Sequence, residues 1–385
     1  MMMNVPYKIV FLITDLDTGG AEIMLLRLLS YLDRGKFDPT VICLSRDGPL
    51  GEKIRSLNIP VVSLRINPAN PDPLAWFQLL KYLRRVRPVL LHTWMYHSDF
   101  FGGLAGFLLK IPVVWAIHNS TTNSQFTRKR TLLIIHLCAL ISRWIPVKIV
   151  SCSEKACTIH EDLGYAAEKF VIIPNGFDLG DYRSDPVAGV NLRAELNIEP
   201  ADPLIGMVAR YNPQKDHANF VQAARIYHQT FPQTHFVLCG EGLTWDNAAI
   251  VAEIEAAGLR DRFHLLGRRD DMPSVFSALT LHTLSSAYGE AFPNVLGEAM
   301  ACSVPCVATD VGDSSFLIGD TGMVIPPRDP QALAAAWERL MNLSQEERLA
   351  LGERARQRVQ QLFSIVQIAQ RYQDLYKQVI DCGAD

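Results

Sequence analysis

The sequence lacks the features of a membrane-spanning or nucleic-acid-binding protein. Its longest apolar stretch, residues 131–149, is interrupted by His136, Arg143 and Lys148, whereas a membrane-spanning helix needs about 20 mostly apolar residues. The formal net charge of −3 gives no general attraction to nucleic acid. The basic cluster at 128–130 makes contact with a membrane surface conceivable. The alternative is a buried helix with a solvated leading edge.

Paired cysteines and a secretory signal are also missing. None of the eight cysteines forms a C-x-x-C pair, and several lie in apolar runs, such as Cys239 at the end of 236–239. This distribution indicates reduced core thiols rather than a disulfide framework or a zinc site. Residues 1–4 lead almost directly into the apolar run 8–13, without the basic stretch and cleavage site of a signal peptide. We therefore expect a cytoplasmic protein.

Short apolar runs alternate with helical patterns along the whole chain. A length of 385 residues favours two domains over one core. The pattern predicts strands at 8–13, 40–44, 60–64, 89–92, 112–117, 149–152 and 171–173, and again at 204–209, 235–240, 263–266, 279–283, 305–309 and 323–325. Strands that alternate with helices in this way form doubly wound, mostly parallel sheets.

The expected fold is therefore α/β, with two Rossmann-like domains that face each other across a deep cleft. We place the first domain at residues 1–178 and the second at residues 179–362. Residues 363–385 are expected to form a helix that packs back on the first domain.

Two carboxylates in the second domain are the most informative residues. Glu290 and Glu298 lie eight positions apart, and Pro293 between them is placed in the first turn of a helix, where its missing N–H costs nothing. The amides of Asn294 and Val295 would then offer an anion site at the helix start. The alternative is an exposed acid and a helix-face acid without a role, but the surrounding pattern favours a site.

Two cations follow the first strand of the second domain. Arg210 and Lys215 lie five residues apart in a strand-to-helix loop. Arginine offers a bidentate fork and lysine a compact point charge, so together they can converge on a diphosphate. Each alone would more often be surface charge. Their position at the carboxyl end of a strand favours the site.

The first domain has a glycine pair in the corresponding place. Gly19 and Gly20 would let the backbone approach a phosphate or a sugar, and a tight structural turn is the alternative. The pair is not part of a G-x-G-x-x-G pattern and does not predict dinucleotide binding.

Histidines also follow strands of the first domain. His118 comes directly after the strand at 112–117, and this position favours a role in the cleft over a structural one. His92, Tyr96 and His97 lie in what we expect to be a neighbouring loop, where they could shape an acceptor site or simply pack.

In order and spacing, these residues resemble the family-4 retaining glycosyltransferases (glycosyl transferases group 1), which share the GT-B architecture of two Rossmann-like domains. The resemblance spans nearly the whole chain and includes the turns at 173–178, 239–242 and 266–268. The single motifs are weak, but their order is specific. Two departures concern local donor contacts: Ser303 stands where the family usually has glycine, and 313–316 lack a common Gly-Glu pair.

The resemblance implies that the first domain lies on the acceptor side and that the second domain binds the nucleotide sugar. It also implies a role for each matching residue. Glu290 would contact hydroxyls of the donor sugar, Glu298 would hold the ribose, and His118 would face the sugar ring near the reacting carbon. Arg210 and Lys215 would neutralise the diphosphate. The implied catalytic residues are His118 and Glu290, and the implied donor-binding residues are Gly19, Gly20, Arg210, Lys215, Leu266, Gly267, Phe292, Pro293, Asn294, Val295 and Glu298.

The resemblance implies transfer of a hexose with retention, from a nucleoside diphosphate, expected to be UDP, to an acceptor hydroxyl. Bacterial relatives build surface polysaccharides on lipid-linked acceptors, so peripheral contact with the inner membrane is a further expectation. No metal or cofactor is expected, and Asp15-Leu16-Asp17, which matches a metal-binding D-x-D pattern, is interpreted as a turn after the first strand. The alternatives are a sugar-nucleotide epimerase or hydrolase and a non-catalytic nucleotide-sugar binding protein.

Overall fold

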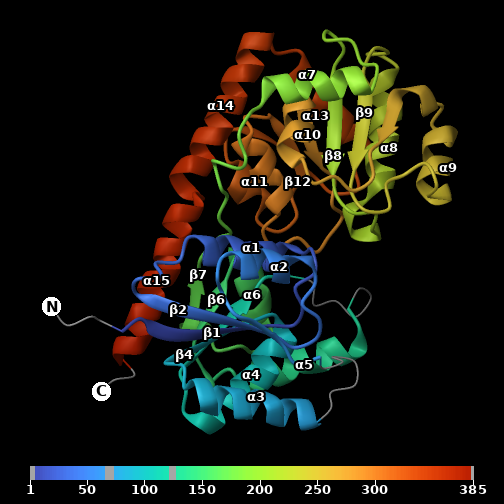
Figure 1. Cartoon of the computed structure of the whole chain (residues 1–385). Helices are drawn as coiled ribbons and strands as arrows, with labels where there is room; N and C mark the ends of the chain where they lie inside the picture. Colours follow the sequence, from blue (N-terminus) through green and yellow to red (C-terminus); the bar gives the residue numbers. More distant parts are fainter. Residues whose placement is uncertain (1–4, 66–72, 121–126, 383–385) are drawn as a thin grey trace. The chain divides into compact units, whose positions relative to one another are not determined.

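The computed structural model describes residues 5–65, 73–120 and 127–382, so the predicted start of the chain at 1–4 lies outside the described residues. The chain divides into two compact units (Figure 1). One contains Met1–Gly176 together with Ile365–Asp385, and the other contains Phe177–Ser364.

The first unit is built on a seven-stranded parallel sheet. Its strand order is β3-β2-β1-β4-β5-β6-β7, so the direction of winding reverses between β1 and β4. The strands are β1 (Tyr7–Ile13), β2 (Phe37–Cys43), β3 (Val61–Ser63), β4 (Leu90–Trp94), β5 (Val113–Ile117), β6 (Pro146–Ser151) and β7 (Phe170–Ile172).

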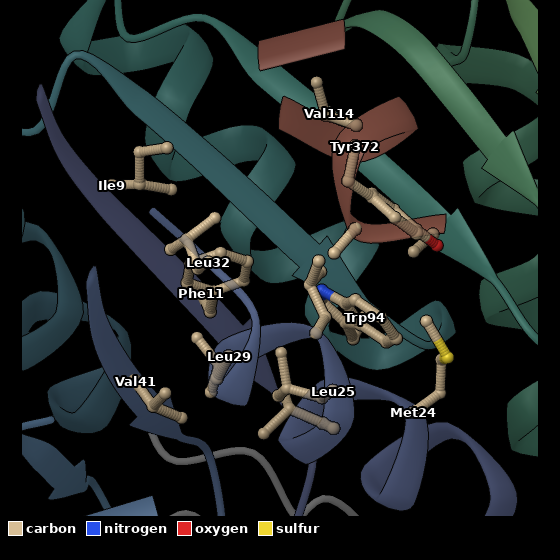
Figure 2. Close-up of a cluster of buried hydrophobic side chains, with 14 of the residues drawn as sticks. Ile9, Phe11, Met24, Leu25, Leu29, Leu32, Val41, Trp94, Val114 and Tyr372 are labelled. Carbon is tan, nitrogen blue, oxygen red and sulfur yellow. The ribbon is translucent and has the colours of Figure 1, made fainter. Parts of the chain in front are cut away.

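Helices cover both faces of this sheet. They are α1 (Gly20–Ser30), α2 (Pro49–Ser56), α3 (Pro73–Val86), α4 (Tyr96–Leu109), α5 (Lys129–Ile141), α6 (Glu154–Asp162) and α15 (Ile365–Cys382). Because successive strand residues point to opposite faces, Ile9 and Phe11 of β1 pack with α1, α2 and α15, whereas Val10 and Leu12 pack with α3, α4 and α5. Figure 2 shows the first of these cores, with Tyr372 of α15 close to the side chain of Trp94.

The second unit repeats the design with six parallel strands. Its order is β10-β9-β8-β11-β12-β13, with the reversal between β8 and β11. The strands are β8 (Leu204–Val208), β9 (His235–Cys239), β10 (Phe263–Leu265), β11 (Leu281–Leu284), β12 (Cys306–Thr309) and β13 (Gly322–Ile325). The helices are α7 (Pro186–Glu195), α8 (His217–His228), α9 (Ala248–Ala256), α10 (Met272–Ala278), α11 (Asn294–Ala301), α12 (Ser314–Ile318), α13 (Pro330–Met341) and α14 (Gln345–Leu362).

Every predicted strand is present, with ends that differ from the prediction by at most three residues. The two Rossmann-like α/β sheets are thus confirmed. The eight cysteines are free thiols, and all but Cys382 are buried. The apolar stretch 131–149 divides into α5 and β6. Within the described ranges, no helix combines the length and the apolar character that a membrane crossing requires.

Candidate active site

The carboxyl edge of the second sheet brings Lys215 and Glu290 together. Lys215 ends the 3-10 turn η2 (Pro213–Lys215) after β8, and Glu290 lies in the loop after β11. These two strands flank the reversal of strand order, which is where open α/β sheets bind ligands. Lys215 Nζ lies 2.5 Å from Glu290 Oε1, and both side chains are largely buried.

Hydroxyl groups at neighbouring strand ends hold Glu290 in place. Ser286 Oγ donates a hydrogen bond of 2.7 Å to Glu290 Oε1. Thr309 Oγ1, at the end of β12, donates a 2.7 Å bond to the carbonyl of Ser286. Ser286 and Thr309 were not predicted as site residues, because serine and threonine are common at strand ends and carry no distinctive spacing.

Backbone contacts tie the same loops together. The amide of Ala287, after β11, donates to the carbonyl of Gln214, after β8, at 2.8 Å. Gly312, after β12, has φ +57°, and a Cβ built there would lie 2.2 Å from the carbonyl oxygen of Glu290. Only glycine allows this approach and this conformation together. The loops after three adjacent strands therefore share one packed arrangement.

The structure places Pro293 at the start of α11, where the sequence predicted the first turn of a helix. Pro293 precedes the helix as its N-cap, with an extended ψ of 104°, and the helix begins at Asn294. A proline ring restricts φ but leaves ψ free to be extended, so it suits a cap as well as the first helical position. Phe292 and Glu298 are both buried, Glu298 within α11, and Val295 is half-buried in its first turn.

The remaining predicted donor residues of this unit lie at the same edge of the sheet. Arg210 follows β8 and is exposed, and Leu266 follows β10 and is half-buried. Gly267 has φ +62°; its amide donates to the carbonyl of Leu243, and its carbonyl accepts from the amide of Gly240, both at 2.8 Å. These bonds connect the loops after β9 and β10.

In the first unit, the glycine pair follows β1, one of the two strands at the reversal. Gly19 is the N-cap of α1, and Gly20 is its first residue. Gly19 has φ −130° and ψ 171°, an extended backbone that any residue adopts. Neither Gly19 nor Gly20 has a positive φ, so the backbone conformation at this turn does not require glycine.

His118 follows β5 and stacks on Trp94 at the end of β4. The ring centroids are 4.5 Å apart and the planes differ by 9°. Both ring nitrogens are buried, although part of the residue stays exposed. Burial lowers the pKa of His118 to about 3, an effect that Asn175 opposes only in part. The imidazole is therefore neutral near pH 7.

The expected loop around residues 92–97 is wrong. β4 continues to Trp94 and α4 begins at Tyr96, which leaves only Met95, with φ +74°, between them. His92 is fully buried and its Nδ1 lies 2.8 Å from Tyr376 Oη of α15.

Tyr96 is buried as well and contacts His160 Nε2 at 2.9 Å through its hydroxyl. His92 and Tyr96 are thus packed in the core, because β4 and α4 direct these side chains inward. His97 is half-buried, and burial lowers its pKa.

The two aspartates of the D-x-D pattern lie in different environments. Asp15 is half-buried just after β1, and burial is the main cause of its raised pKa. Asp17 is exposed, and Leu16 between them is fully buried. Among the described residues, no three His, Cys, Asp or Glu side chains gather as a metal site would require.

Comparison with known families agrees with this arrangement. Residues 18–181 match the family model described as Glycosyltransferase Family 4, and residues 191–358 match the model described as Glycosyl transferases group 1. The two matches follow the two α/β units closely.

Similar proteins include curated enzymes and solved structures. The chain is 23% identical over 376 residues to the UDP-Gal:alpha-D-GlcNAc-diphosphoundecaprenol alpha-1,3-galactosyltransferase of Escherichia coli, covering 93% of each chain. It is 25% identical to the putative glycosyltransferase EpsF of Bacillus subtilis, over 79% of each.

Among solved structures, Anabaena Alr3699/HepE in complex with UDP matches with a TM-score of 0.84 at 24% identity, over 96% of this chain and 100% of that one. Sucrose-phosphate synthase from Thermosynechococcus elongatus matches with a TM-score of 0.79 at 21% identity, over 98% and 100%. These likenesses identify the fold as GT-B. With both α/β units matched by the models of a single enzyme class, the chain belongs to the family-4 (group 1) glycosyltransferases.

Proposed function

We propose that this glycosyltransferase is a retaining hexosyltransferase that uses a UDP-sugar and needs no metal ion. Its acceptor is a hydroxyl group of a lipid-linked glycan, and its product enters a bacterial surface polysaccharide at the cytoplasmic face of the membrane. The observation that carries the proposal is the Lys215–Glu290 pair at the reversal between β8 and β11.

The names of similar proteins support the choice of donor and acceptor. The Escherichia coli relative is named for a UDP-galactose donor and a diphosphoundecaprenol-linked acceptor. The Anabaena protein of the same fold has been solved with UDP and with UDP-glucose. A lipid-linked acceptor would also bring the enzyme to the membrane surface.

The second unit would bind the donor. Arg210 and Lys215 follow β8 and would share the charge of the diphosphate, a bidentate fork beside a point charge. The amino-terminal end of α11, which carries partial positive charge, would face the same group through the backbone of 292–295. Glu290 would accept hydrogen bonds from sugar hydroxyls, and Glu298 from the ribose.

In the reaction, the bond between the anomeric carbon and the diphosphate oxygen breaks as the acceptor oxygen bonds to the same face of that carbon. The acceptor proton passes to the leaving phosphate oxygen, so the products are the glycoside and the nucleoside diphosphate. Lys215 and Arg210 would stabilise the developing negative charge, which supports a reaction without a metal ion. From the first unit, neutral His118 would hydrogen-bond the sugar, and the Gly19–Gly20 backbone would approach the donor.

The first test is a thermal-unfolding screen of the purified protein with UDP-, GDP- and ADP-sugars in the absence of metal. We expect UDP-sugars to raise the melting temperature, and one of them to do so most. Incubation of that sugar with lipid-diphosphate-linked acceptors should then yield a glycoside whose anomeric configuration, measured by NMR, equals that of the donor.

The same assays distinguish the alternatives. An epimerase or hydrolase would consume the donor equally well without acceptor, and a binding protein would be stabilised by the donor without turnover. An inverted product would contradict retention, and full dependence on Mg²⁺ or Mn²⁺ would contradict metal independence.

A further inference from the structure

Helix α5 carries an exposed apolar stripe on the side that faces away from the core. Ile135, Cys138 and Ala139 are buried against the sheet, whereas Leu133 and Leu140 are 60% and 63% exposed. Residues seven apart lie within about 20° of each other around a helix, so the two leucines share one face. Trp144, three residues beyond the helix, is 65% exposed.

Helix α4, which packs beside α5, also carries exposed apolar side chains. Phe107 and Leu108 in its last turn are 62% and 56% exposed. Single exposed apolar residues are common, but Leu133, Leu140 and Trp144 occur together on and just after one helix, as they do at an interaction surface.

The charge of this region is strongly one-sided. Residues 100–153 contain no Asp or Glu, and they contain six cations: Lys110, Arg128, Lys129, Arg130, Arg143 and Lys148. The whole chain has 37 Lys and Arg and 40 Asp and Glu. The residues outside 100–153 therefore hold 31 of the cations and all 40 acidic residues, a net charge of −9. Arg128 and Lys129 at the start of α5 are exposed, as is Arg143 after its end. Exposed cations therefore stand at both ends of the apolar stripe.

A hollow of about 420 Å³ lies along the same surface. Its lining includes His136, Leu140, Arg143 and Trp144. Tryptophan beside a cation is typical of the interface between lipid headgroups and acyl chains, where an apolar ring and a charged group are both satisfied.

We infer that this α5 surface, defined as Arg128, Lys129, Leu133, Leu140, Arg143 and Trp144, binds the protein to an anionic lipid bilayer. The leucines and Trp144 would enter the headgroup region, and the cations would contact lipid phosphates. Helix α5 has 13 residues, about 20 Å, and lies on its own sheet, so it rests on the membrane rather than crossing it.

A second copy of this chain is a poorer partner for the surface. In a symmetric dimer the same patch meets itself, so the basic residues of one copy would lie near those of the other. An anionic bilayer offers both the apolar layer and the opposite charge. The inference rests on the membrane location proposed above and identifies the residues that would contact the membrane. It can be tested without any transferase assay.

The test is co-sedimentation of the full chain with vesicles of phosphatidylcholine, with and without phosphatidylglycerol. We expect binding to the anionic vesicles that weakens as salt is added. Leu140→Ser/Trp144→Ser and, separately, Arg128→Gln/Lys129→Gln should each weaken this binding at least about tenfold. The matched control is Val187→Ser/Val190→Ser on α7, whose valines are 72% and 60% exposed and whose loss should leave binding unchanged.

Three results would overturn the inference: no binding of the unaltered protein to anionic vesicles, equal binding by the α5 variants, or a dimer in sedimentation velocity that only the α5 variants dissociate. Circular dichroism and the UDP-dependent shift in melting temperature show that each variant is folded. If vesicle binding behaves as expected but no UDP-sugar stabilises the protein, the proposed donor fails while the membrane surface stands.

Discussion

Lys215 Nζ lies 2.5 Å from Glu290 Oε1, and this pair joins the loops on either side of the strand-order reversal in the second unit. The side chains are only 17% and 9% exposed, so each is held in one orientation. Ser286 holds the same carboxylate oxygen from within the β11 loop. Two groups of opposite charge are thus positioned side by side, one suited to a phosphate and the other to sugar hydroxyls.

Replacing either member of the pair should abolish most of the transferase activity. We expect Lys215→Met and Glu290→Gln each to lower kcat/KM by about 100-fold or more, since groups that act on transition-state charge have effects of this size. Each single change also breaks this largely buried ion pair and should lower the free energy of unfolding by about 1–3 kcal/mol.

The double variant separates the two effects. Lys215→Met/Glu290→Gln should recover part of the lost stability but none of the activity, as measured by urea unfolding and donor turnover. The control is Glu255→Gln, which breaks an exposed pair with Arg260 and should leave turnover unchanged. Near-normal turnover in either single variant would remove the pair from the mechanism.

Gly312→Ala should damage both stability and activity. The new Cβ would lie 2.2 Å from the Glu290 carbonyl at a backbone φ of +57°, so the Glu290 loop must move. We expect a loss of about 3 kcal/mol in unfolding free energy and a fall in turnover.

Gly258→Ala is the matched comparison for Gly312→Ala. Its φ is +71°, yet nothing lies within 4 Å of the added Cβ. It should cost only about 1 kcal/mol through backbone strain and leave turnover intact. Equal effects of the two changes would show that the close approach to Glu290 is unimportant.

His282 should make the protein less stable in mild acid. This β11 residue is fully buried, and burial lowers its pKa to about 3, below the value of about 6.5 in an unfolded chain. In this pH range His282 binds a proton in the unfolded state but not in the native state. The free energy of unfolding therefore falls as the pH drops from about 6.5 towards 3.

His282→Leu removes this contribution. Between pH 6.5 and 5, the unfolding free energy of this variant should fall by about 2 kcal/mol less than that of the unaltered protein. Urea-unfolding curves of both proteins at the two pH values give this difference. Other buried histidines, such as His92 and His160, are present in both proteins, so their contributions cancel in this difference. Parallel pH profiles would contradict the prediction.

Tyr376→Phe should weaken the packing of α15 against the sheet of the first unit. It removes the hydroxyl that lies 2.8 Å from buried His92 Nδ1, and we expect a loss of about 1–3 kcal/mol in unfolding free energy. The control lies one turn away: Tyr372 is also fully buried, but its hydroxyl has no hydrogen-bond partner among the described residues. Tyr372→Phe should be neutral or stabilising, and a similar loss in both variants would mean that the hydrogen bond contributes nothing.

The strand pattern shows how far local signals go. Buried strands such as β5 and β8 are apolar over their whole length, and the intervening helices follow their own period, so two doubly wound sheets were predictable from the chain alone. The order and spacing of many weak motifs along nearly the whole chain, with Glu290 and Glu298 among the strongest, likewise predicted the family.

Local signals failed where neighbouring structure decides the outcome. His92 and Tyr96 were predicted in a loop, because no local signal shows that β4 continues to Trp94. Nor does the local sequence show that Tyr376 and His160, which are distant along the chain, form hydrogen bonds with them in the core. Pro293 was predicted in the first turn of a helix, and only the structure shows that it is the N-cap, with an extended ψ.

The sequence by itself determined the two α/β units and the enzyme family, because both follow from short-range periodicity and from the order of residues along the chain. The tertiary structure alone decided that Lys215 meets Glu290 across 75 positions, that Gly312 lies against the Glu290 carbonyl, and that the leucines of α5 face outward. Those contacts depend on which strands become neighbours and on how their loops pack, and no local pattern encodes either.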